Sequence, residues 1–90
     1  MAAFVIAYDL HQRNPDYDHL IAAIEEAFPQ NCHVQLSVWI VVADATAMEV
    51  RDKLSSHVPR SASFLVSKLH NDSCWQGYPM KVCNWLSANL

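Results

Sequence analysis

The sequence predicts a single α+β domain, residues 1–90, with the element order βαββαβ and a further helix at the C-terminus. Three observations predict it. Short apolar stretches rich in β-forming residues alternate with stretches of helical periodicity. A length of 90 residues favours one domain. The chain has one glycine, which excludes the glycine-rich phosphate loops of Rossmann and P-loop proteins.

Composition limits the classes of partner. Hydrophobic residues make up 52% of the chain and charged residues 17%, which argues against disorder and predicts apolar surface hidden in an oligomer. The net charge is −3 and the six Lys and Arg are scattered, so strong non-specific binding to a nucleic-acid phosphate backbone is not predicted. Three cysteines without CxxC spacing, and no apolar run of transmembrane length, predict a reduced, cytoplasmic protein without a membrane segment.

The fold is organised around Phe4–Asp9, five apolar or aromatic residues that end in a carboxylate. We predict a strand over Ala3–Leu10, apolar on both faces and therefore interior to a sheet. Asn14 is the expected N-cap and Pro15 the expected first residue of a helix that runs to Ala27. The apolar residues at helical spacing along it are Tyr17, Leu20, Ile21, Ile24, Ala27 and Phe28.

A hairpin and a second helix come next. Cys32–Leu36 alternates with polar residues, as an edge strand does, and Val38–Ala43 is wholly apolar, as an interior strand is. We expect a tight turn near Gln35–Ser37 between them. Thr46, followed three residues later by Glu49, is the signature of a capping box at the start of a helix.

The remaining elements complete the fold class. Pro59 ends the second helix, Phe64–Leu69 is the predicted fourth strand, and Met80–Asn89 is the predicted final helix. This order is the ferredoxin-like plan, an antiparallel four-stranded sheet of order 4-1-3-2 with two helices on one face. The other face would be bare and apolar, so we expect the C-terminal helix and a second subunit to cover it.

Asp9 is the main candidate site residue because it ends the most buried strand. We take strands one and three as parallel neighbours, which places Asp9 and Asp44 at the same rim of the sheet. Carboxylates grouped there would hold Mg²⁺ or Mn²⁺, and such an ion activates water against a phosphodiester. Two alternatives stay open: Asp44 as a turn or capping residue, and Asp9 as a strand end satisfied by backbone N–H groups.

The other polar candidates give weaker signals. His11, two residues after Asp9, is a candidate general base, with a solvated loop residue as the alternative. His70 follows strand four and is expected at the opposite end of the sheet from His11. The five histidines show no HxH or HxxxH spacing, so no zinc site within one subunit is predicted. Ser61 and Ser63 show no recognisable His and Asp partners.

Four segments carry a resemblance to a known family: Tyr8-Asp9, Trp39–Asp44, Glu49–Leu54 and Cys83–Leu86. With them the chain resembles the small SinR-like proteins, which are similar in turn to CRISPR-associated protein two, the ferredoxin-fold partner in spacer acquisition. The resemblance implies a homodimer with packed sheet faces. It further implies that Asp9 from both subunits lies in the dimer groove and serves metal-dependent cleavage of RNA or DNA.

Three hypotheses of function follow. The first is a Mg²⁺-dependent endonuclease that acts as a homodimer, with Asp9 as the catalytic and metal-binding residue. The second is a non-catalytic dimeric module that binds nucleic acid or a protein partner, and the third is a small regulatory or structural dimer without nucleic acid. The acidic balance and the sparse Lys and Arg favour the second and third. Whether Asp44 or His11 assists Asp9 stays open.

Overall fold

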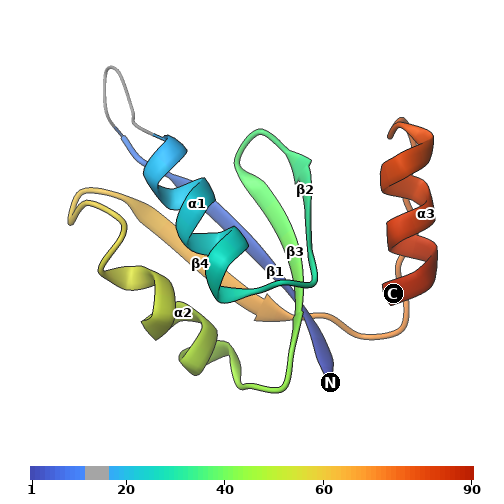
Figure 1. The fold of residues 1–90 in the computed structure, drawn as a ribbon, viewed down its shortest axis with the longest axis horizontal. Coiled ribbons are helices and arrows are strands. Elements are labelled where there is room, and N and C mark those ends of the chain that lie inside the picture. Colours follow the sequence, from blue (N-terminus) through green and yellow to red (C-terminus); the bar gives the residue numbers. More distant parts are fainter. Residues whose placement is uncertain (12–16) are drawn as a thin grey trace.

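The computed structural model describes residues 1–11 and 17–90. In them, four strands form one antiparallel sheet of order β2-β3-β1-β4, with three helices around it (Figure 1). The elements are β1 (Ala2–Asp9), α1 (Tyr17–Ala27), β2 (Asn31–Gln35), β3 (Val38–Ala43), α2 (Ala47–Ser55), β4 (Ser63–Lys68) and α3 (Met80–Asn89). This confirms the α+β class and the order 4-1-3-2, which is the same order counted from the other edge, and it is consistent with the ferredoxin-like plan. The expected helix-start residues Asn14 and Pro15 lie outside the described residues.

β1 is antiparallel to both of its neighbours. Ala2 pairs with Ala43 of β3, and Asp9 pairs with Ser63 of β4. The expectation that strands one and three run parallel is therefore wrong. The crossover through α1 makes β2 parallel to β1, and the tight hairpin then reverses the chain, so β3 runs against both.

The hydrophobic core lies between the sheet and the pair α1 and α2, which cover one face of it (Figure 1). Alternate residues of β1 point into this core, because successive side chains of a strand face opposite ways. The buried residues that form it are Phe4, Ile6, Tyr8, Leu10, Leu20, Ile24, Phe28, Trp39, Val41, Val50 and Leu54. We call this side of the sheet the covered face.

α2 begins as its sequence predicts. The Thr46 hydroxyl accepts a hydrogen bond from the Glu49 backbone N–H at 3.2 Å, and the Glu49 carboxylate accepts one from the Thr46 N–H at 2.9 Å. This reciprocal capping box satisfies two donors that a helix start otherwise leaves unpaired. The helix ends at Ser55, before Pro59.

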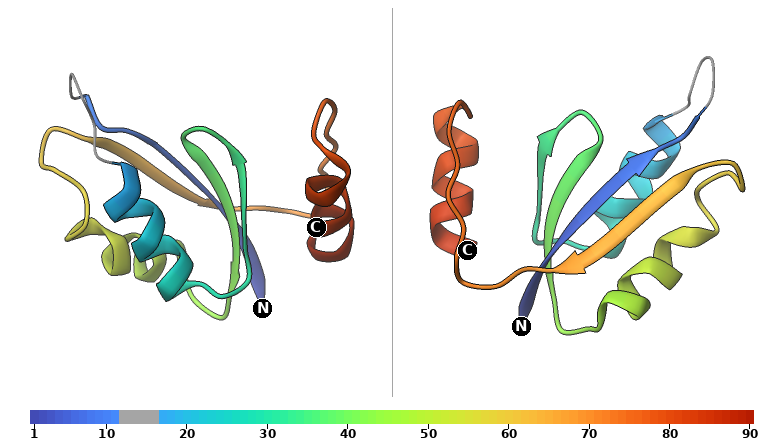
Figure 2. Two further views of the ribbon diagram at one scale, coloured as in Figure 1. Left: turned by 45° about the horizontal axis from the view of Figure 1, so that its top comes forward. Right: turned by 180° about the vertical axis from the view of Figure 1, so that it is seen from behind.

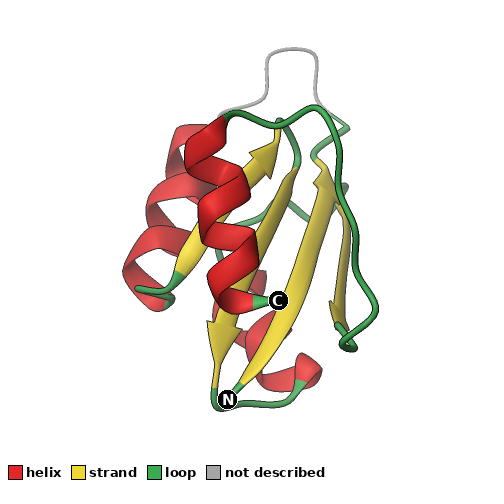
Figure 3. Cartoon of the chain, turned by 90° about the vertical axis from the view of Figure 1, so that its right-hand side faces the viewer, coloured by secondary structure: helices red, strands yellow, loops and turns green. Residues whose placement is uncertain are grey.

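The opposite side of the sheet, the open face, is covered in part by α3. Figure 2 shows α3 beyond β2, apart from α1 and α2, and Figure 3 shows it in front of the strands. Leu86 of α3 is buried, and with Leu90 it lines a small hollow of about 210 Å³ whose floor includes Val5 and Ile40. The expectation that the C-terminal helix covers part of this face is confirmed.

The β4 side of the open face is less apolar than expected. Side chains that are paired across antiparallel strands share a face, so Ser63, Leu65 and Ser67 lie there beside Asp9, Ala7 and Val5 respectively. Two of these three β4 residues are serines, and all three are exposed. The apolar part of the open face is therefore concentrated on β1 and β3, near α3.

Candidate functional site at the end of the central strand

Asp9 lies where β1 ends, on the open face, with 66% of its side chain exposed. The backbone N–H of His11 donates a hydrogen bond to Asp9 Oδ1 at 2.9 Å. This is the local turn that Asp forms readily with the backbone two residues later. The carboxylate is thus partly satisfied by the loop that follows it, as the alternative interpretation of Asp9 expected.

His11 connects Asp9 to β4. Its Nε2 atom is 2.7 Å from the Ser63 hydroxyl, and its Nδ1 atom is 3.5 Å from Asp9 Oδ1. The backbone of His11 has φ of +53°, in the left-handed region that residues other than glycine seldom adopt. A left-handed residue outside glycine costs free energy, so the contacts with Asp9 and Ser63 offset a local strain.

Ser63 is a site residue that sequence reasoning missed, because its His and Asp neighbours could not be recognised from spacing in the sequence. It lies 52 residues from His11 in sequence, but the β1–β4 pairing places it directly opposite Asp9. The antiparallel plan itself was the signal that could have found it. The order Ser63–His11–Asp9 is that of a nucleophile, a base and an orienting acid.

The geometry shows how far this resemblance to a catalytic triad extends. The 2.7 Å contact between Ser63 and His11 is a full hydrogen bond. The 3.5 Å separation of His11 Nδ1 from Asp9 Oδ1 exceeds the ordinary range of about 2.7–3.2 Å, and that oxygen already accepts the His11 backbone N–H. The Asp9 carboxylate therefore binds the backbone N–H of His11 more closely than it binds the His11 imidazole ring.

Asp44 is not part of this site. Because β1 and β3 are antiparallel, Asp44 follows Ala43, which pairs with Ala2 at the far end of β1. At ~3.3 Å per residue the eight positions between them put the two carboxylates roughly 25 Å apart, so the expectation of a shared rim is wrong. Asp44 instead lines a hollow of about 440 Å³ at the other end of the sheet, together with Lys68 and His70. The placement of His70 at the opposite end from His11 is confirmed.

A divalent ion would need more oxygen ligands than the single Asp9 carboxylate provides. Mg²⁺ takes about six oxygen ligands and is often held by one or two carboxylates with water and substrate phosphate. Among the described residues, no cluster of three or more His, Cys, Asp or Glu side chains could hold a metal. Asp9 offers one carboxylate per subunit, and both contacts found for it in the described part of the chain use Oδ1. Two subunits, or a bound phosphate, would have to supply further oxygens.

Two groups near the core have perturbed pKa values. Burial raises the pKa of the Tyr8 phenol above 10.0, and the hydrogen bond from Trp39 opposes this in part. Burial also raises the pKa of the Cys32 thiol, against a smaller opposing effect of the Lys81 charge. Both shifts favour the neutral form, so neither group is prepared as a nucleophile.

No protein-family model matches this chain, and the search of curated proteins finds no match either. The resemblance to SinR-like proteins and to CRISPR-associated protein two therefore stays a prediction. Within the described ranges, no helix combines the length and the apolar character that crossing a membrane requires.

Proposed function

We propose that this protein is a cytoplasmic homodimer of the ferredoxin-like, SinR-like type that cleaves phosphodiester bonds in RNA or DNA with Mg²⁺ or Mn²⁺ at Asp9. The observation that carries the proposal is the exposed Asp9 carboxylate at the end of the central strand, with the His11 imidazole beside it. The three cysteines are free thiols, which supports a reduced compartment.

In this proposal each residue has a separate task. Asp9 of each subunit would supply a carboxylate oxygen to the ion, and a bound divalent ion would make a nearby water molecule more acidic. His11 takes the proton from that water, and Ser63 orients the ring through its 2.7 Å contact with Nε2. The exposed Arg60, three residues before Ser63, supports an approach of phosphate from this end.

The open face supports the dimer. On this face Val5 and Ala7 of β1 and Val38 and Val42 of β3 are half-buried, Ile40 is buried, and Leu65 of β4 is 59% exposed. Packing two such faces would remove that surface from water and bring the two copies of Asp9 toward one groove. A single subunit offers too few oxygens for a fixed ion, so in this proposal the dimer is the catalytic unit.

The second candidate function is a dimeric module that binds nucleic acid or a protein without catalysis. It is favoured by the lack of a carboxylate cluster among the described residues and by the net charge of −3. In it, Asp9 is a strand end that fixes the His11 turn, and Ser63 and His11 are polar contacts of the surface.

One experiment separates the two candidates. Wild type, Asp9→Asn and His11→Gln are assayed on RNA and on DNA with Mg²⁺, with Mn²⁺ and with a chelator, and their masses in solution are measured. We expect a dimer whose cleavage requires the metal, is lost in Asp9→Asn and falls by about a hundredfold or more in His11→Gln. Metal-dependent cleavage that persists in Asp9→Asn excludes the proposed role of Asp9. Binding without cleavage in wild type favours the second candidate.

Ser63→Ala is the matched control for this experiment. The substitution removes the hydroxyl that contacts His11 and leaves the carboxylate unchanged. If Ser63 only orients the ring, cleavage should fall less than in His11→Gln. If Ser63 were the nucleophile, Ser63→Ala would abolish activity and the metal requirement would be absent.

A further inference from the structure

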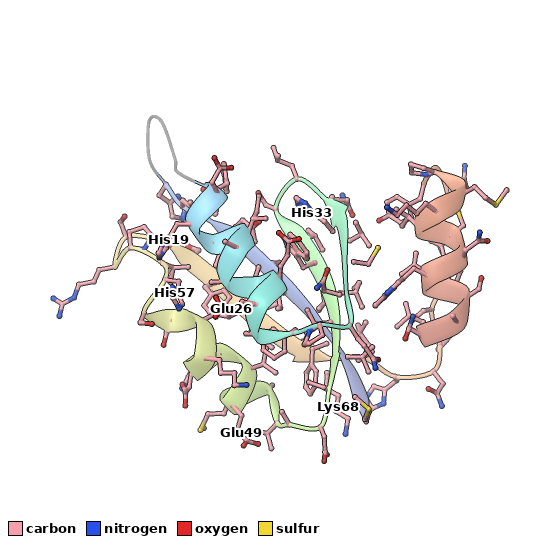
Figure 4. The ribbon with its side chains drawn as sticks, in the orientation of Figure 1. His19, Glu26, His33, Glu49, His57 and Lys68 are labelled. Atoms are coloured by element: carbon pink, nitrogen blue, oxygen red, sulfur yellow. The ribbon has the colours of Figure 1, made fainter. Side chains whose placement is uncertain are left out.

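A second pair of polar side chains meets away from Asp9, between α1 and the segment that follows α2. His19 Nε2 is 3.1 Å from His57 Nδ1, and the two ring centroids are 5.1 Å apart with the rings inclined at 45°. Figure 4 shows the two side chains close together, one from each element. His19 is exposed and His57 half-buried, so the pair is open to solvent.

Two ring nitrogens 3.1 Å apart repel each other through their lone pairs unless a proton or a cation lies between them. A neutral imidazole has one nitrogen that carries a proton and one that carries a lone pair, so a proton lies between the two facing nitrogens. A cation could take its place. If the donor ring moves its proton to its other nitrogen, both facing nitrogens present lone pairs and no net proton is lost.

The separation of the two nitrogens is close to what a shared ion requires. Two nitrogens bound to one tetrahedral zinc ion at about 2.0–2.1 Å are about 3.3–3.4 Å from each other. The observed 3.1 Å is a few tenths of an ångström shorter. A small outward rotation of the exposed His19 ring would open the pair enough to admit the ion.

The sequence spacing of the histidines predicts no zinc site within one subunit, but the fold brings two of them together across 38 positions. We propose that His19 and His57 form a binding site for a transition-metal ion that favours imidazole, such as Zn²⁺ or Ni²⁺. The ion would join α1 to the end of α2. Among the described residues no third His, Cys, Asp or Glu completes a cluster, so these residues give the ion two ligands and water would supply others. The site is distinct from Asp9, because Mg²⁺ prefers oxygen ligands and imidazole does not suit it.

The charges around the pair are compatible with a cation. A hollow of about 410 Å³ beside His57 is also lined by Glu26 and Lys53. Glu26 is seven residues after His19, on the same side of α1, and contributes negative charge. The Lys53 ammonium group contributes positive charge to the same hollow and lies 5.7 Å from the centre of the Phe28 ring, within reach of a weak cation–π contact.

The test uses the untagged protein and its variants His19→Gln and His57→Gln, titrated with Zn²⁺ and with Ni²⁺ by calorimetry. His70→Gln is the matched control, an exposed histidine at another place in the fold. We expect one ion per chain in wild type and in the control, and at least about a tenfold weaker affinity in each of the other variants. Metal about tenfold above its dissociation constant should raise the unfolding midpoint of wild type by about 5–10 °C.

Paramagnetic Ni²⁺ gives an independent readout, because it broadens the NMR signals of the ring protons nearest to it. The signals of His19 and His57 should broaden first, and those of His11, His33 and His70 later. This readout also separates the site from ions that bind the free thiols.

Three results would overturn the proposal: no binding of either ion to wild type, unchanged affinity in His19→Gln, or first broadening at another histidine. If His57→Gln unfolds by circular dichroism, His19→Gln decides alone, since its ring is exposed. Asp9→Asn should keep the site intact, so its outcome does not depend on the nuclease proposal.

Discussion

The two faces of the sheet are made by the same strands and differ in how they are packed. On the covered face, Phe4 and Ile6 of β1 have no exposed surface. On the open face, Val5 and Ala7 of the same strand are half-buried, and their neighbour Leu65 is 59% exposed. The covered face therefore contains most of the buried core, whereas the open face keeps apolar surface in contact with solvent on its β4 side.

The strongest test of this contrast compares Phe4→Ala with Val5→Ala, adjacent residues that point to opposite faces. Phe4→Ala should lower the free energy of unfolding by about 3–5 kcal/mol, because it leaves a cavity in the core. Val5→Ala should cost about 1 kcal/mol, since only part of its side chain leaves water on folding. Urea denaturation measures both losses in the free energy of unfolding, provided that the dependence of this free energy on urea concentration has the same slope in both variants. Equal losses would mean that the open face is also a rigid core.

Tyr8→Phe tests whether the covered face needs the buried hydrogen bond between Tyr8 and Trp39. The Trp39 indole N–H donates to the Tyr8 hydroxyl at 3.2 Å, and both side chains are buried. Removing the hydroxyl leaves that N–H without a partner, at an expected cost of about 1–3 kcal/mol in the free energy of unfolding. Tyr17→Phe, a half-buried ring 5.9 Å from Tyr8, is the control and should change it less. A neutral Tyr8→Phe would mean that Trp39 finds another acceptor.

The dependence of stability on pH gives a smaller effect with a definite sign. Burial raises the pKa of folded Tyr8 above 10.0, the value of the unfolded chain. Above pH 10 the unfolded state therefore loses the proton first, and the free energy of unfolding falls as pH rises toward the folded pKa. Tyr8→Phe should reduce this decline, measured as the unfolding midpoint between pH 9 and 11, the range of roughly one unit on each side of the reference pKa. An identical decline in the variant would assign it to other groups.

Local signals in the sequence predicted most of the elements. Thr46 and Glu49 predicted the start of α2, and the apolar run Val38–Ala43 gave the bounds of β3 without error. These features depend on neighbours within a few residues, so composition and spacing contain the needed information. The bounds of α3, Met80–Asn89, were also predicted correctly from helical spacing.

The contacts of the candidate site could not be predicted in the same way. The direction of β3 relative to β1 depends on the crossover between them, and the error there brought Asp44 wrongly to Asp9. The contacts of His11 with Ser63 and of His19 with His57 join residues 52 and 38 positions apart. Such pairs follow from strand register and helix placement, which no local motif encodes.

The smallest expected change in stability belongs to Leu65→Ser, which tests the open face as a surface for a second subunit. Leu65 is 59% exposed and points away from the covered face, so the free energy of unfolding of the monomer should change by no more than about 0.5 kcal/mol. If two open faces pack together, the same substitution should weaken the dimer, measured as mass in solution over a range of concentrations. Leu36→Ser is the matched control, because Leu36 is 76% exposed in the turn between β2 and β3. Dissociation caused by Leu36→Ser and not by Leu65→Ser would place the contact at the hairpin, and the two copies of Asp9 would then not share a groove.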